Sequence, residues 1–275
     1  MKLISDSGST KTDWLLTDKD FVVASCRTQG INPFIQSEEF IESVIRDELL
    51  PQIPLNGFLS DIRFYGAGCR SKQGQMVHAI LSRHFSGANI EVASDMLCAA
   101  RALCGHEAAI ACILGTGANS CLFDGTEIVN NISPLGYILG DEGSGAFLGK
   151  VLLANIYKHL LSEELAEDFR AVYSLTVDEV LQRVYREPLP NRYLASFTPF
   201  LKKHESHPEI QQLLFSAFDS FFKRNILAYH HPELPVHFVG SIAYFFQNSL
   251  QEAACHNNVN IGRIIREPLE RWRNI

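Results

Sequence analysis

Short apolar runs separated by polar turns dominate the chain. The first run ends at Asp6, small residues follow, and a second run begins after Lys11, which predicts a strand, a tight turn and another strand. Ser9 flanks Gly8, whose lack of a side chain lets backbone N–H groups approach an anion, and Thr10 and Lys11 add a hydroxyl and a positive charge. Asp6 is placed to bind a hydrated metal ion that bridges phosphate oxygens. Taken alone, such a segment is more often a plain hairpin.

The pattern then alternates between strands and amphipathic helices. The further expected strands are residues 21–25, 62–65, 90–93, 108–114, 121–123, 236–239 and 260–265. The expected helices are residues 38–49, capped by Ser37 and ended by Pro51, a second helix that ends at Gly87, and residues 96–103. From residue 147 to 229 the chain is mostly helical. Strands that alternate with helices indicate an α/β protein.

Asp95 follows the strand expected at residues 90–93 and precedes a helix. Open α/β sheets place their ligands at the carboxyl ends of parallel strands, so this carboxylate is a candidate catalytic base. Asp is also a good N-cap residue, and by itself the cap explains its position as well as catalysis does. The two roles are compatible with each other.

A glycine-rich hairpin occurs a second time later in the chain. The apolar run of residues 108–114 leads into Gly115, Thr116 and Gly117, and another strand follows. Two such hairpins, each opening an α/β segment, could hold a polyphosphate from both sides through backbone N–H groups. A dense polar turn at residues 136–145 precedes a helix, and Gly240-Ser241 forms a strand-to-helix turn where a nucleoside could lie against the backbone.

Length, charge and cysteine usage narrow the functional classes. The 275 residues favour two domains, expected at residues 1–105 and 106–275. The net charge of −7 argues against a broad nucleic-acid surface, and no apolar run is long enough for a membrane span. No export signal is visible, so a cytoplasmic protein is expected. Seven dispersed cysteines without ligand spacing predict reduced thiols, not a disulfide framework, a zinc site or an iron–sulfur cluster.

Five segments, taken together and in order, resemble the BadF/BadG/BcrA/BcrD-type ATPases, and among these most closely the N-acetylglucosamine kinases. The segments are D-S-G-S-T-K-T at residues 6–12, S-D at 94–95, L-G-T-G-A-N-S at 114–120, L-G-D-E-G-S at 139–144 and V-G-S-I-A at 239–243. The resemblance spans nearly the whole chain. It implies the actin/hexokinase/Hsp70 superfold, a two-lobed α/β actin-like ATPase (ribonuclease H-like) fold with a nucleotide cleft between the lobes.

The resemblance also implies a role for each candidate residue. Asp6 is expected to organise Mg²⁺, and Asp95 to act as the base toward the sugar 6-hydroxyl. The residues expected at ATP are Ser9, Thr10, Lys11, Gly115, Thr116, Gly117, Gly240 and Ser241. The residues expected at the sugar are Asn32, Asp95, Gly136 and Asp141. Pro134-Leu135 stands where such kinases have a Gly-Trp pair beside the sugar.

Three functional hypotheses result. The first is an ATP- and Mg²⁺-dependent kinase of a small amino sugar, N-acetylglucosamine at its 6-hydroxyl, with N-acetylmuramate as a variant. The second is an ATPase that activates a 2-hydroxyacyl-CoA dehydratase-type partner by electron transfer through a shared iron–sulfur cluster. The third is a sensor that binds sugar or nucleotide without catalysis. Phosphoryl transfer needs mainly positioning and charge neutralisation, which two phosphate loops, Mg²⁺ and one carboxylate can supply. No nucleic-acid or membrane partner is expected, and a homodimer stays open.

Overall fold

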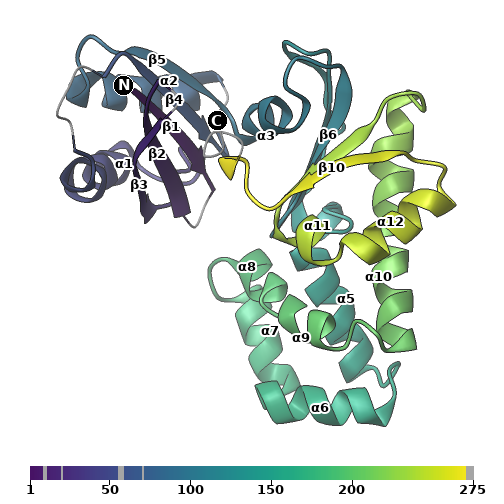
Figure 1. Ribbon diagram of the computed structural model, residues 1–275. Coiled ribbons are helices and arrows are strands. Elements are labelled where there is room, and N and C mark those ends of the chain that lie inside the picture. The colour runs from purple at the N-terminus through teal and green to yellow at the C-terminus, as the bar shows by residue number, and fades with distance from the viewer. Residues whose placement is uncertain (9–10, 20, 55–58, 70, 271–275) are drawn as a thin grey trace. The chain divides into compact units, whose positions relative to one another are not determined.

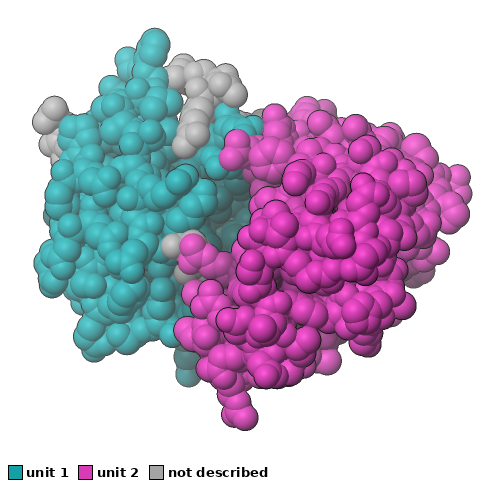
Figure 2. Space-filling view, turned by 90° about the horizontal axis from the view of Figure 1, so that it is seen from below, with its two compact units in different colours: residues 1–105, 267–275 teal, residues 106–266 magenta. Residues whose placement is uncertain are grey.

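The structure, a computed structural model, describes residues 1–8, 11–19, 21–54, 59–69 and 71–270 (Figure 1). Ser9 and Thr10, both expected at ATP, lie outside the described residues. The chain divides into two compact units, shown in different colours in Figure 2. Unit 1 is residues 1–105 together with the residues from Glu267 on, and unit 2 is residues 106–266. The division expected from the sequence had assigned the residues after Arg266 to the second domain.

Unit 1 is built on a five-stranded sheet, counted over the described residues. Its elements are β1 (Lys2–Ser7), β2 (Lys11–Asp18), β3 (Phe21–Gln29), α1 (Glu38–Ser43), a π-helical turn (Val44–Leu49), a 3-10 turn (Leu50–Gln52), β4 (Asp61–Gly66), α2 (Ser71–His84), β5 (Asn89–Ser94) and α3 (Asp95–Cys104). The strand order is β3-β2-β1-β4-β5. β2 is antiparallel to both of its neighbours, whereas β1, β4 and β5 are parallel.

The two faces of this sheet have different cores, because successive strand residues point to opposite faces. Leu3 and Phe64 belong to a large cluster that includes buried residues of α1 and α2. Ile4 and Tyr65, each one position further along its strand, belong to a smaller cluster with Cys98 of α3 and other residues. Asp6 lies two residues after Ile4 on β1 and therefore shares the face that α3 covers.

Unit 2 also has a five-stranded sheet among its described residues. Its elements are β6 (Ala109–Leu114), β7 (Ala118–Phe123), β8 (Ile128–Asn130), α4 (Gly136–Leu139), α5 (Gly145–Tyr157), α6 (Glu163–Tyr173), α7 (Val177–Tyr185), α8 (Pro190–Ala195), α9 (Thr198–Lys203), α10 (Pro208–Phe221), a π-helical turn (Phe222–Ile226), a 3-10 turn (Leu227–Tyr229), β9 (Val236–Val239), α11 (Ser241–Phe245), α12 (Gln247–His256) and β10 (Ile261–Ile265). These bounds agree with the strand at 236–239 and the long helical stretch expected from the sequence.

The topology of unit 2 repeats that of unit 1. Its strand order is β10-β9-β6-β7-β8, with β6, β9 and β10 parallel and β7 antiparallel to both neighbours. β6 therefore corresponds to β1, β9 to β4, and β10 to β5. The units differ between the third and fourth strands, where unit 1 has α1 with two short turns and unit 2 has α4 to α10. The likeness of the two hairpins thus extends to both sheets.

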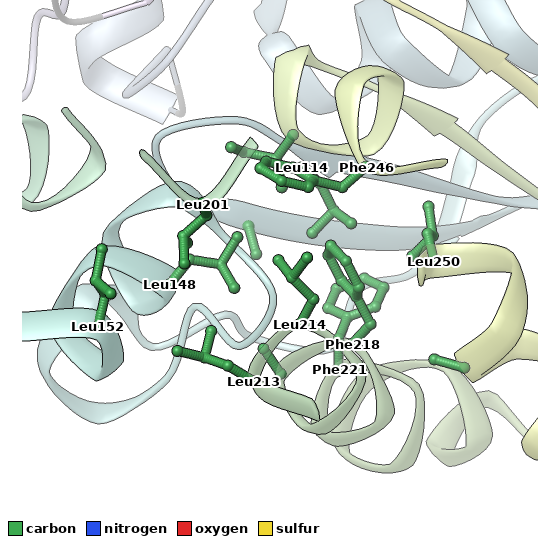
Figure 3. Packing of buried hydrophobic residues seen from close by; sticks show 14 of the residues in the cluster. Leu114, Leu148, Leu152, Leu201, Leu213, Leu214, Phe218, Phe221, Phe246 and Leu250 are labelled. Carbon is green, nitrogen blue, oxygen red and sulfur yellow. The ribbon is translucent and has the colours of Figure 1, made fainter. Parts of the chain in front are cut away.

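The helices α4 to α10, between β8 and β9, contribute to a large apolar core in unit 2. Leu114, the last residue of β6, belongs to the same buried cluster as Leu148 of α5, Phe218 of α10 and Leu250 of α12 (Figure 3). The residue that opens the second glycine-rich turn is therefore fixed by packing from several helices. No helix of the described residues combines the length and the apolar character that crossing a membrane requires.

Candidate active site

The carboxyl ends of β1, β4 and β5 lie at one edge of the unit 1 sheet. Ser7 pairs with Gly66, and Gly66 pairs with Ser94, so Asp6 and Asp95 flank the same row of strand ends. Neighbouring strands are about 4.8 Å apart, which separates the two backbones by only two strand spacings. The sequence predicts Asp95 at the carboxyl end of a parallel strand, and this register agrees with that prediction.

Burial and neighbouring carboxylates raise the pKa of Asp6 from 3.8 to about 7. Removal from water is the largest cause, and the negative charges of Asp95 and Asp13 act in the same direction, while Lys11 opposes them. Asp6 and Asp95 are therefore electrostatically coupled, and a cation close to both would relieve the repulsion.

Asp95 is the first residue of α3, and Ser94 is the N-cap. The Ser94 side chain accepts a hydrogen bond from the backbone N–H of Leu97. The Asp95 carboxylate accepts one from the N–H of Met96 and is partly exposed. The interpretation of Asp95 as the helix cap was therefore wrong. Ser94 is the N-cap, because its backbone is extended and its hydroxyl accepts the hydrogen bond from the first turn. The catalytic interpretation of Asp95 stays a prediction.

The raised pKa of Asp6 predicts a specific pH dependence of stability. The folded state keeps the Asp6 proton up to about pH 7, whereas the unfolded chain releases it near 3.8, so stability falls as pH rises through this window. Asp6→Asn removes this loss. Above pH 7 the variant is expected to have a higher melting temperature than the wild type and an unfolding free energy larger by at most about 4 kcal/mol, whereas near pH 4 the two proteins should be alike. Melting curves of both metal-free proteins across this range test it, and parallel pH profiles would contradict it.

Lys11 has two carboxylate partners in unit 1. Its ammonium lies 2.6 Å from Asp13 Oδ2 and 3.5 Å from Glu267 Oε1. Asp13 also accepts a 2.7 Å hydrogen bond from Arg27 Nε. Burial by itself would raise the pKa of Asp13, but the hydrogen bonds from Lys11 and Arg27 outweigh burial and keep that pKa below its ordinary value. The positive charge expected at ATP is thus paired with the carboxylates of Asp13 and Glu267.

Two buried hydroxyls that the sequence interpretation missed connect the hairpin to the candidate sugar residue. Ser7 Oγ and Thr12 Oγ1 are 2.6 Å apart, and both accept hydrogen bonds from the N–H of Ile31, at 3.0 and 3.2 Å. Ser7 Oγ also donates to the carbonyl of Ile31, at 2.9 Å. Asn32 comes directly after this pinned residue. The sequence shows only that a hydroxyl residue stands on each side of the expected turn, and the complete burial of both is seen in the structure.

Asn32 shapes its own loop and leaves no room beside it. It is 9% exposed, and its Oδ1 accepts a hydrogen bond from the N–H of Phe34. A Cβ atom on Gly68, which has φ +76°, would lie 2.2 Å from Asn32 Oδ1. Gly68 follows β4, so the Asn32 loop packs directly against a turn at the same strand edge as Asp6.

The glycine-rich turn of unit 2 is anchored by the start of α5. The N–H of Gly145 donates to the carbonyl of Gly115, at 2.8 Å, and the N–H of Ala146 donates to the carbonyl of Thr116, at 3.0 Å. Gly117 accepts a hydrogen bond from the N–H of Gly115. Thr116 is exposed at the tip of the turn. These contacts fix the backbone of Gly115, Thr116 and Gly117, as a preorganised phosphate loop requires.

Gly240 brings the third candidate turn against the second. Its φ is +123°, and a Cβ there would lie 2.3 Å from the carbonyl oxygen of Leu114 and 3.2 Å from the nitrogen of Gly115. Its N–H donates to the carbonyl of Ile265. Within unit 2 the structure therefore brings together Gly115, Thr116, Gly117, Gly240 and the adjoining Ser241, which is exposed.

Asp141 lies beside the same turn. A Cβ on Gly117 would be 3.1 Å from Asp141 Oδ2, and the N–H of Ala118 donates to the Asp141 carboxylate. Burial, which is the largest cause, and the charge of Glu142 raise the pKa of Asp141 to about 6, although the Ala118 hydrogen bond opposes them. Asp141 has φ +55°, an uncommon conformation for Asp that its backbone hydrogen bonds to Pro134 and Ser144 hold.

Gly136 begins α4 in the same loop, is exposed, and has no atom within 4 Å of a Cβ position. Leu135, which stands where the resemblance implies a tryptophan, is 63% exposed with φ +61°. Gly140 packs so closely on the Pro134 carbonyl that a Cβ would lie 2.1 Å from its oxygen. The two ends of the loop from Pro134 to Asp141 are therefore packed against each other, whereas Gly136 has free space beside it.

The residues fit a metal ion held mainly by phosphate and water. The described residues contain no group of three or more His, Cys, Asp or Glu side chains that could hold a metal ion by themselves. Asp6, by contrast, is a hard oxygen donor with a second carboxylate charge nearby. Mg²⁺ keeps several waters and often takes only one or two protein carboxylates together with substrate phosphates. The observed donor set matches that habit.

Comparison with solved structures finds proteins of similar fold over nearly the whole chain. A crystal structure from Porphyromonas gingivalis, of a protein proposed to be an N-acetylglucosamine kinase, is 45% identical over 98% of this chain and 96% of that one, with a TM-score of 0.96. A protein of Chromobacterium violaceum with the same proposed assignment is 18% identical over 99% and 97%, with a TM-score of 0.77. The ethanolamine utilization protein EutJ of Carboxydothermus hydrogenoformans is 15% identical over 100% and 88%, with a TM-score of 0.58. The last two show likeness of fold alone.

No protein-family model and no curated protein matched the chain. The identity to the P. gingivalis protein nevertheless extends over nearly the full length of both chains. Together with the repeated sheets and the ordered motifs, it means that the chain belongs to the BadF/BadG/BcrA/BcrD-type ATPase family, among the relatives of the N-acetylglucosamine kinases, and has the two-lobed actin-like ATPase fold of the actin/hexokinase/Hsp70 superfold.

Proposed function

We propose that the protein is an ATP-dependent sugar kinase that phosphorylates an amino sugar, N-acetylglucosamine at its 6-hydroxyl. The observation that carries the proposal is Asp95: a carboxylate at a parallel-strand edge, coupled to Asp6, at a position where Ser94 already serves as the helix cap. The similarity to the P. gingivalis protein supports the same class of reaction. N-Acetylmuramate is the alternative substrate, because Leu135 differs from the tryptophan of related kinases.

In the proposed reaction Asp95 accepts the proton of the 6-hydroxyl while the hydroxyl oxygen attacks the γ-phosphorus of ATP; the bond from that phosphorus to the β–γ bridging oxygen breaks, and ADP leaves. Asn32 and Asp141 orient the sugar through hydrogen bonds, and Gly136 leaves room for it. Lys11, Thr116, Gly117 and the backbone around them hold the phosphates, with Ser9 and Thr10 expected to assist. Gly240 and Ser241 lie beside the nucleoside.

Mg²⁺, when bound, neutralises charge on the transferring phosphate. Asp6 is the residue that would hold it, directly or through water. With the ion bound, Asp6 would be ionised, because a nearby cation lowers the pKa that burial and Asp95 raise. The carboxylate of Asp95 remains available for the hydroxyl proton.

A screen of ADP release against amino sugars tests the proposed function. The kcat/KM for N-acetylglucosamine is expected to exceed that for glucose by about 10- to 100-fold, because a buried polar group that loses its partner costs about 1–3 kcal/mol. N-Acetylmannosamine and N-acetylmuramate complete the panel. Equal kcat/KM for glucose and N-acetylglucosamine would contradict the assignment of Asn32 and Asp141, and no release with any sugar would favour a sensor.

A further variant links this preference to Asn32. Gly68→Ala keeps the Asn32 amide but crowds its Oδ1, which lies 2.2 Å from the new Cβ. The variant is expected to lose part of the preference for the acetamido sugar. Gly74→Ala serves as the control, because the nearest atom there is 3.6 Å away, an ordinary contact.

A further inference from the structure

The face of the unit 1 sheet that carries Asp6 is covered partly by the C-terminal segment. Leu269 is 1% exposed and packs in one cluster with Ile4, Leu15, Tyr65 and Cys98. The chain enters unit 2 after Gly105 and re-enters unit 1 at Glu267, directly after the strand β10 and Arg266. The segment from Glu267 to Glu270 therefore packs, through Leu269, on the strands β1 and β2 that form the first hairpin.

This segment supplies a second carboxylate to Lys11. Glu267 Oε1 lies 3.5 Å from the ammonium, in addition to the 2.6 Å contact with Asp13 Oδ2. Asp13 has only a 10% exposed side chain and is shared with Arg27, whereas the side chain of Glu267 is 28% exposed. The ammonium is thus held by two carboxylates that lie far apart in the sequence.

We propose that Glu267 is a positioning residue of the nucleotide site, anchored by Leu269, and that it holds the Lys11 ammonium where the phosphates of ATP bind. The inference rests on the proposed function, because it treats Lys11 as a contact of ATP. Lysine has four rotatable bonds and a strongly hydrated head, so an unrestrained Lys11 must lose rotamer freedom on meeting a phosphate. Asp13 and Glu267 together restrict the Lys11 side chain, so part of that loss has already occurred on folding, and Glu267 supplies the second of the two restraints.

Two effects of Glu267 act in opposite directions. Its negative charge repels a phosphate, whereas its hold on Lys11 reduces the entropy lost on binding. The ammonium, 3.5 Å from Glu267, offsets part of that repulsion. Removal of the charge alone should therefore weaken ATP binding, and the sign of the change distinguishes positioning from simple repulsion.

Glu267→Gln keeps the size of the side chain and removes its charge. We expect the KM for ATP to rise by about three- to tenfold, the cost of ordering one long side chain, with kcat and the KM for the sugar unchanged. Glu270→Gln removes a charge from the same segment and is the matched control, for which no change is expected. In a Lys11→Met background, Glu267→Gln should have no further effect on the KM for ATP. Leu269→Ala should raise the KM for ATP as well, together with a lower melting temperature.

A second measurement does not depend on turnover. The ammonium NMR signal of Lys11, identified by its loss in Lys11→Met, should be sharp in the nucleotide-free wild type and broadened or shifted in Glu267→Gln. If the wild type uses ATP but Glu267→Gln has an equal or lower KM for ATP, the inference is overturned and the proposed function stands. If the wild type transfers no phosphate to any sugar, the proposed function fails, and an unchanged Lys11 signal in Glu267→Gln overturns the inference separately.

Discussion

Replacing Asp95 by Asn is expected to lower kcat by about 10²–10⁴ while sugar affinity and melting temperature change little. Asn keeps the shape of the side chain and its ability to accept the hydrogen bond from the Met96 N–H, but it is not a base. The structure sharpens this expectation, because Ser94 caps α3. A change at Asp95 therefore leaves the cap intact, and a loss of turnover cannot be ascribed to fraying of the helix.

Ser94→Ala is the matched control for this experiment. Loss of the cap should cost about 1 kcal/mol of stability and lower the melting temperature. Its kcat should fall far less than that of Asp95→Asn, because the carboxylate remains. Kinetics, equilibrium sugar binding and melting of both variants give the answer. Near-normal turnover of Asp95→Asn would remove Asp95 from the mechanism.

Gly240→Ala is expected to lower the unfolding free energy by about 3 kcal/mol or more and to weaken nucleotide binding at the same time. The residue has φ +123°, and a Cβ would lie 2.3 Å from the Leu114 carbonyl oxygen, which is backbone and cannot rotate away. Either the β9–α11 turn or the start of the Gly115 turn must move. Chemical denaturation and ATP titration measure the two effects.

Gly115→Ala is the control that separates folding from binding. No atom lies within 4 Å of its Cβ position, and its φ is not in the left-handed region. Melting should therefore match the wild type. If the turn holds phosphates as proposed, the added methyl group should still reduce ATP affinity, since the backbone must approach the anion closely. Wild-type stability and wild-type ATP affinity in Gly240→Ala would contradict the packing described for that turn.

Local sequence patterns determined the elements of the fold. Short apolar runs on either side of the small-residue turns at Gly8 and Gly115 predicted both hairpins, and helical spacing with Ser37 as the cap predicted the helix that follows β3. These features are encoded within a few residues, because strand alternation and helix capping depend on near neighbours. The recurrence of the hairpin predicted two α/β segments, and the strand orders show in addition that the two sheets share one topology.

Other features depend on contacts between distant segments, and no local pattern contains them. Whether Asp95 or Ser94 caps the helix depends on which of the two has the extended backbone. Residue propensities do not place the start of a helix to within one residue. The burial of Asp6 and its coupling to Asp95 require the alignment of strands β1, β4 and β5.

The sequence by itself therefore determined which residue types stand at the turns of this protein, and so the class of ligand that those turns suit. Only the tertiary structure decided how the turns are held: Ser7 and Thr12 pin the residue before Asn32, Gly240 packs on the Leu114 carbonyl, and Glu267 returns to Lys11 from the far end of the chain. The physical reason is that hydrogen bonds and close backbone contacts act through space, whereas propensity acts along the chain.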